Sequence, residues 1–182
     1  MDVKTLCLGA LTLGDATGYE IRKLFEEGPF AHFYDAGYGS IYPALASLLE
    51  DGFVSVTEEQ HVGRPDRKVY ALTPVGLQRF KTALAEPPKP DRIRSENLLR
   101  FFFVDLMEPD DIRRVYDGYV AHFETMIAHM RGLDPAGVAP GRLFARGLGL
   151  SFYEAVATYL RDGRDAFERD VLADGGGKEA AQ

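Results

Sequence analysis

Three cations near the middle of the chain, Arg64, Arg67 and Lys68, stand around a turn formed by Gly63 and Pro65. Guanidinium and ammonium groups presented on a turn bind phosphates, and an arginine can also enter the negative potential of a narrow minor groove. We therefore predict that these residues contact the DNA backbone or minor groove. Replacing Arg64 or Arg67 by alanine is expected to flatten the salt dependence of binding by roughly one unit of slope.

A second group of candidate DNA-binding residues lies upstream, in a helix predicted from about Gly37 to Asp51. Ile41, Leu45 and Leu48 repeat at helical spacing and predict a buried face. The opposite face then carries short side chains, which let a helix axis approach base edges. Its candidates are Ser40, Pro43 and Ser47, although Ser47 is equally well explained as an ordinary surface position.

Charge does not distribute evenly along the sequence. The 182 residues carry a net charge of -7, which argues against binding nucleic acid through bulk electrostatics. Between residues 61 and 81, however, five basic residues face a single acid, Asp66. Because the local field at a contact face decides binding, this segment is the expected DNA-facing region.

The elements that must position these residues are predicted from caps and periodicity. Residues 3–13 favour a helix, and Thr17 and Glu20 have the spacing of a capping box that starts a second helix ending near Gly28. Alternation at 53–56 and 69–72 predicts two strands joined through the basic turn. Thr73 and Pro74 start a fourth helix with an expected apolar face of Leu77, Phe80 and Leu84. Residues 1–85 are thus predicted to form a winged helix-turn-helix with a two-stranded β-wing.

The rest of the chain is predicted to be all-helical, so that the fold class is mainly α. Its prolines predict that residues 86–90 form a short stiff linker. Residues 91–173 are expected to form a helical domain, and residues 174–182 a flexible polar tail. Apolar residues from Ile112 to Met130 step by four and three, which predicts a heptad seam. The partner of this seam is either a neighbouring helix or a second subunit. Aromatic residues could line an effector pocket or form plain core; the candidates are Phe102, Tyr116, Tyr119, Phe123 and Phe152.

Other chemistry finds little support. Cys7 lies among leucines and is expected in the core, and His122 and His129 share a helical face without a third ligand. There is no nucleophile–base arrangement, phosphate-binding loop or dinucleotide motif, so we expect no enzyme activity, no metal and no cofactor. Without an apolar run long enough to cross a membrane or a signal segment, the expected location is the cytoplasm.

Five spaced blocks in residues 1–85 resemble the PadR family of bacterial transcriptional regulators. They are Leu11–Leu13 with Gly18-Tyr19-Glu20-Ile21, then Gly39-Ser40-Ile41-Tyr42-Pro43-Ala44-Leu45, Gly52-Phe53-Val54, Gly63-Arg64-Pro65 with Arg67-Lys68-Val69-Tyr70, and Leu72-Thr73-Pro74-Val75-Gly76. The helical remainder is similar to the longer subclass, with Tyr159-Leu160 where that subclass often has Trp-Leu.

The resemblance implies a homodimeric repressor that binds a pseudo-palindromic operator in double-stranded DNA and releases it for a signal, which the family allows to be a small aromatic effector. It places Ser40, Tyr42 and Pro43 at the recognition helix and Tyr19 on the helix before it. Ala46, Ser47 and Leu49 depart from the family pattern of Lys, Arg and Glu, which shifts phosphate binding toward the wing. The alternative is a small-molecule or protein sensor whose winged domain has weak or lost DNA binding.

Overall fold

The computed structural model describes residues 1–32, 38–59, 67–91 and 93–175. The chain divides into two compact units, Met1–Asp91 and Arg92–Gln182. The basic turn, including Arg64 and its neighbours Gly63 and Pro65, lies outside the described residues.

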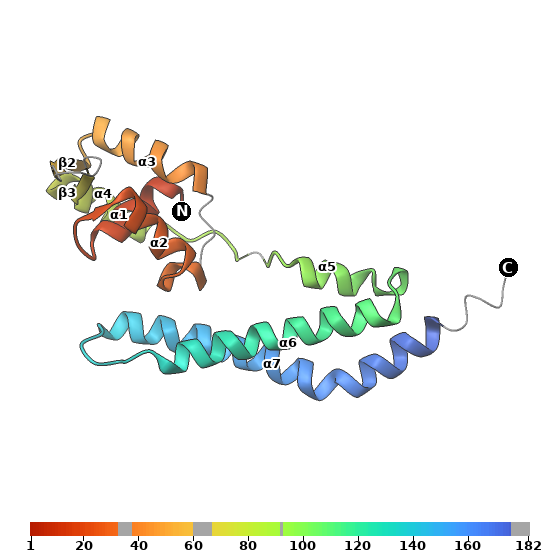
Figure 1. The fold of residues 1–182 in the computed structure, drawn as a ribbon. Helices are drawn as coiled ribbons and strands as arrows, with labels where there is room; N and C mark the ends of the chain where they lie inside the picture. The colour runs from red at the N-terminus through yellow and green to blue at the C-terminus, as the bar shows by residue number, and fades with distance from the viewer. Residues whose placement is uncertain (33–37, 60–66, 92, 176–182) are drawn as a thin grey trace. The chain divides into compact units, whose positions relative to one another are not determined.

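The described residues of the N-terminal unit form four α-helices and a small sheet, seen in Figure 1. The helices are α1 (Val3–Leu11), α2 (Gly18–Glu26), α3 (Tyr38–Glu50) and α4 (Pro74–Ala85), with a 3-10 turn η1 (Pro29–His32) after α2. Their shared core is made by side chains at most a few per cent exposed, among them Cys7, Leu8, Leu11, Ile21, Phe25, Ile41, Leu45 and Leu48. The predicted buried face of α3 is confirmed.

Local capping explains where these helices begin and end. The Asp2 carboxylate accepts from the Thr5 amide at the start of α1, and Thr17 and Glu20 form the expected capping box of α2. Thr73 caps α4, with Pro74 in its first turn. Gly52, at φ 72°, closes α3 in the left-handed region that favours glycine, where the amide of Phe53 bonds the carbonyl of Leu48.

The sheet has one more strand than the sequence predicts. Strands β2 (Val54–Glu59) and β3 (Arg67–Leu72) pair antiparallel as expected, but β1 (Ala16–Thr17) pairs with the other edge of β3. The order is β1-β3-β2. A two-residue strand carries no periodicity that sequence could display, and β1 ties the start of α2 to the wing.

The predicted apolar face of α4 is only partly correct. Phe80 packs on the core, whereas Leu77 and Leu84 are exposed. The inward contact is made instead by Gly76, where a Cβ atom, if one were present, would lie 1.9 Å from the carbonyl oxygen of Phe53. The absence of a side chain at this position therefore lets α4 lie directly against the chain that enters β2.

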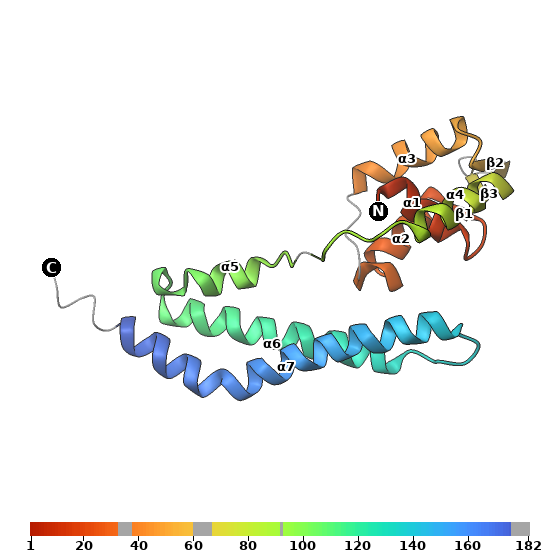
Figure 2. The ribbon, with the colours of Figure 1, turned by 180° about the vertical axis from the view of Figure 1, so that it is seen from behind.

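The C-terminal unit is helical, with α5 (Glu96–Phe102), a 3-10 turn η2 (Val104–Leu106), α6 (Pro109–Gly132) and α7 (Pro140–Gly175). Helices α6 and α7 run side by side in both views of the ribbon (Figures 1 and 2). Helix α7 continues through Gly175, beyond the predicted end of the helical domain at 173. No helix in the described parts of the chain is long and apolar enough to span a bilayer.

The partner of the heptad seam is α7 of the same chain. Tyr116 and Phe123 on α6 pack with Ala157 and Leu160 on α7 in one buried cluster. Three ion pairs flank the seam, and their α6 members are seven residues apart: Arg131–Glu154 at 2.6 Å, Glu124–Arg161 at 3.4 Å and Asp117–Arg164 at 2.7 Å. Along these three pairs the residue numbers fall on α6 while they rise on α7, so the two helices are antiparallel. The charges help to set the register of the helix pair.

Candidate nucleic-acid interface and effector groove

The exposed face of α3 carries the predicted recognition residues. Tyr42 is 46% exposed and Pro43 is exposed, while Ser40 and Ser47 are half-buried at the margins of this face. Tyr19, from the first turn of α2, is 57% exposed. The most accessible side chains are therefore the two tyrosines and the proline, and the serines are less prominent than the sequence predicts.

Gly18 brings the start of α2 against the recognition helix. A Cβ atom at this position would lie 2.6 Å from Cε1 of Tyr42, which is closer than side-chain atoms approach one another. The ring of Tyr42 therefore rests where any other residue at position 18 would place its side chain. This contact orients an exposed aromatic side chain on α3 through packing against α2.

Three cations among the described residues of the wing and α4 are paired with acids. Arg67 bonds Glu20 at 2.5 Å, Lys68 pairs with Glu58 at 3.7 Å and Arg79 with Glu86 at 3.8 Å. The positive charge counted over residues 61–81 is thus reduced in the folded chain. Of these partners, Glu20 was expected only as a helix cap, because no local signal reveals a partner 47 residues away.

Glu20 is held as a carboxylate. Hydrogen bonds from the backbone amide and hydroxyl of Thr17, together with the nearby guanidinium of Arg67, lower the pKa of Glu20. The ionised form is the one that accepts all of these bonds. A fixed negative charge therefore lies at the root of the wing, beside a cation that was predicted to meet DNA.

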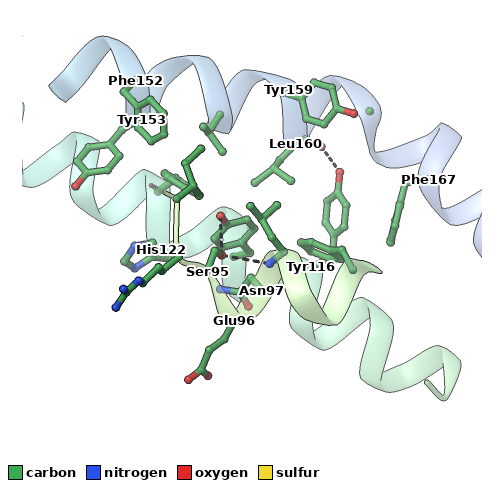
Figure 3. A pocket seen from close by; sticks show the side chains of 18 residues that line it. Ser95, Glu96, Asn97, Tyr116, His122, Phe152, Tyr153, Tyr159, Leu160 and Phe167 are labelled. Carbon is green, nitrogen blue, oxygen red and sulfur yellow. Dashed lines mark hydrogen bonds between the residues drawn. The ribbon is translucent and has the colours of Figure 1, made fainter. Parts of the chain in front are cut away.

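The C-terminal unit contains a groove of about 770 Å³ between α5, α6 and α7, shown in Figure 3. Four predicted effector residues line it: Tyr116, Tyr119, Phe123 and Phe152. Phe102 is not among the lining residues; it is 79% exposed and packs on Phe103, and its neighbour Phe101 lines the groove instead. Helix α5 turns Phe101 inward toward Tyr116 and Tyr119, at ring-centre distances of 5.9 and 5.8 Å.

Polar residues also line the groove, namely Arg94, Ser95, Glu96, Asn97 and His122 beside the tyrosines. The hydroxyl of Tyr116 donates to the carbonyl of Leu160, drawn as a dashed line in Figure 3, and the hydroxyls of Ser95 and Tyr119 lie 3.5 Å apart. Burial raises the pKa of Tyr116 and Tyr153, so both phenols stay neutral. A groove of this size, with mostly apolar and aromatic walls and a few polar and charged side chains, suits a flat aromatic molecule that carries polar groups.

A three-helix core with an exposed recognition helix and a β-hairpin wing defines a winged helix-turn-helix DNA-binding protein. Residues 7–82 match the model of the "Transcriptional regulator PadR-like family". The chain therefore carries a PadR-like domain and is similar to PadR family transcriptional regulators, which are not enzymes.

Three relatives extend the similarity beyond this domain. The "Negative transcriptional regulator PadR" of Bacillus subtilis is 24% identical over 131 residues, 71% of each chain. Crystal structures of smu.1604c from Streptococcus mutans and of the PadR-like regulator BC1756 from Bacillus cereus are 25% and 26% identical, with TM-scores of 0.81 and 0.76; they cover 91% and 93% of this chain and 99% of their own.

Bacillus subtilis PadR is also known in crystal structures with operator DNA and with p-coumaric acid. These are 20% identical to this chain, with TM-scores of 0.73 and 0.65. They cover 90% and 91% of this chain and 98% of their own, so the fold extends over both units.

Proposed function

We propose that the protein is a cytoplasmic, homodimeric repressor that binds a pseudo-palindromic operator and releases it when a small aromatic molecule enters the groove. The observation that carries the proposal is the exposed face of α3 in a PadR-like domain, followed in the same chain by an aromatic groove. A negative regulator among the relatives, and its structures with operator DNA and p-coumaric acid, support repression and an aromatic effector.

Exposed apolar side chains on α7 support the dimer. Phe144, Leu148, Phe152 and Tyr159 are all more than half exposed and recur at spacings of four and seven along the helix. A stripe of this kind is expected to pack against another protein surface, and a two-fold pair presents two recognition helices to one palindrome. Leu148→Glu, in the middle of the stripe, should halve the mass measured by light scattering; an unchanged mass would place the interface elsewhere.

Operator release requires a ligand that binds two dimer geometries with different affinity. Recognition helices must lie about 34 Å apart to occupy successive major grooves, so a change of dimer angle weakens binding. Phe152 contributes to both the groove and the exposed stripe. We propose that a ligand acts on the dimer through this shared side chain.

The first experiment is binding to a duplex from the promoter region next to the protein's own coding sequence, at several salt concentrations, with random duplex as competitor. Specific binding that weakens steeply with salt is expected. p-Coumaric acid serves as the first aromatic probe, and it should release the duplex. The variant Val156→Phe, which fills the groove, should bind the duplex but lose the response, whereas Thr158→Phe, at an exposed position outside both the groove and the stripe, should retain it.

A second candidate function is a sensor with weak or lost DNA binding. It is favoured by the pairing of Arg67, Lys68 and Arg79 with acids, which leaves less positive charge for phosphates. Equal and weak binding of promoter and random duplex would support it against the repressor.

A further inference from the structure

Glu20 connects the helix-turn-helix to the wing through both of its carboxylate oxygens. Oε2 accepts from the backbone amide and the hydroxyl of Thr17, each at 2.8 Å, and completes the cap of α2. Oε1 accepts from Nη2 of Arg67, the first residue of β3, at 2.5 Å. One side chain therefore joins the start of α2 to the root of the wing.

The surrounding backbone holds both partners in place. Thr17 belongs to β1, where it pairs with Val69 of β3, two residues after Arg67. On the opposite edge of β3, Arg67 lies across from Glu59 of β2 in the backbone register of the two strands. The side chains of Arg67 and Glu20 are 48% and 47% exposed, so each is half shielded from solvent. Because both emerge from paired or capped backbone, the ion pair needs less ordering than one between mobile surface side chains.

This arrangement conflicts with a simple phosphate contact by Arg67. A phosphate that approached the guanidinium would meet the ionised carboxylate of Glu20 beside it. The interaction with DNA would then have to compensate for like-charge repulsion, or break the bond to Glu20. The same geometry is well suited to positioning. It fixes the orientation of β3, and with it that of β2, which pairs with β3 in the wing.

We propose that Glu20 is a positioning residue for operator binding, which holds Arg67 at the wing root so that the wing keeps a fixed orientation relative to α2 and α3. Arg67 acts through Glu20 and does not neutralise a phosphate itself. The inference rests on the proposed DNA-binding function, and it revises the sequence-based expectation for Arg67.

The test compares the full-length wild type with Glu20→Gln, Arg67→Ala and the double variant. Glutamine keeps an oxygen for the Thr17 cap but removes the charge that holds Arg67. Binding is measured to the promoter duplex and to random duplex over a range of salt. Each single variant should weaken promoter binding by up to about fivefold, and the double variant should be no weaker than the weaker single variant. The salt slope should not change, whereas loss of a phosphate contact would lower it by about 0.9.

Glu58→Gln is the matched control. It removes the same charge from an acid that pairs with Lys68 across the β2–β3 ladder, with no link to α2. It reports the general effect of one less negative charge, and its effect should add to that of Arg67→Ala. Circular dichroism of every variant confirms that the helices persist, so a loss of promoter-over-random preference reflects positioning and not unfolding.

The outcomes distinguish failure of the proposed role of Glu20 from failure of the proposed DNA-binding function. A lower salt slope in Arg67→Ala, with promoter binding of Glu20→Gln intact, would make Arg67 a direct phosphate ligand and overturn the inference. Additive losses in the double variant would also overturn it. If the wild type itself shows no preference for the promoter duplex, the proposed function fails, and the role of Glu20 in operator binding fails with it.

Discussion

Replacement of Gly76 by alanine tests how α4 is fixed to the wing. The new methyl would lie 1.9 Å from the carbonyl oxygen of Phe53. Contacts of a Cβ atom shorter than 3.0 Å are essentially never observed, so the two atoms must move apart by about 1.1 Å. The same oxygen accepts from the backbone amide and hydroxyl of Thr73, at 3.2 and 3.0 Å. The substitution therefore forces α4 away from Phe53 and strains its own cap.

The expected loss of stability follows from these contacts. Overpacking against backbone costs about 1–3 kcal/mol, and two weakened hydrogen bonds cost about 1 kcal/mol each. The better helix propensity of alanine returns up to about 1 kcal/mol. We therefore expect the N-terminal unit to lose about 2–4 kcal/mol of unfolding free energy, which lowers the urea midpoint by roughly 1–2 M.

The single cysteine makes the assay specific to this unit. Cys7 is fully buried in the core of the N-terminal unit, so a pulse of thiol reagent at each urea concentration labels only chains in which that core has opened. The matched control is Gly39→Ala on α3, where a Cβ atom would meet none of the described residues within 4 Å and the midpoint should stay or rise slightly. A wild-type midpoint for Gly76→Ala would refute the argument that the missing side chain sets this contact.

Three further predictions concern the DNA-facing surface and the core. Gly18→Ala should weaken promoter binding with little loss of stability, because its methyl displaces the flexible ring of Tyr42; equal binding by wild type and variant would contradict this. Arg64→Ala should lower the salt slope of DNA binding by about 0.9, as expected for one lost phosphate contact, and an unchanged slope would remove Arg64 from the contact surface. Cys7 should not react with a thiol reagent at pH 8 without denaturant, because burial raises its pKa to about 12; rapid labelling of the native protein would show that this core opens readily.

The pairing of charges changes how the electrostatics of the protein should be understood. Glu20 and Glu58 reduce the positive field of the wing, so we expect attraction to DNA to depend more on shape and on correctly placed contacts than on net local charge. Affinity for random DNA should then be modest, and specificity should come from the exposed residues of α3.

The sequence by itself determined the starts of α2 and α4, the end of α3 and the winged architecture. The capping box of Thr17 and Glu20, the Thr73-Pro74 start of α4 and the Gly52 stop are local signals, because each joins groups within a few residues of one another. The alternation of β2 and β3 and the heptad of α6 are equally local patterns, and both are found in the structure.

Tertiary structure alone decided which of these elements meet. Three contacts join residues that are far apart in the chain. They are the pairing of β1 with β3, the bond between Glu20 and Arg67, and the packing of the α6 seam on α7. The same is true of the groove, where a rotation of one residue along α5 brings Phe101 into the lining and leaves Phe102 in solvent. Periodicity identifies an apolar face but does not identify its partner, because that choice depends on the packing and charge of the whole unit.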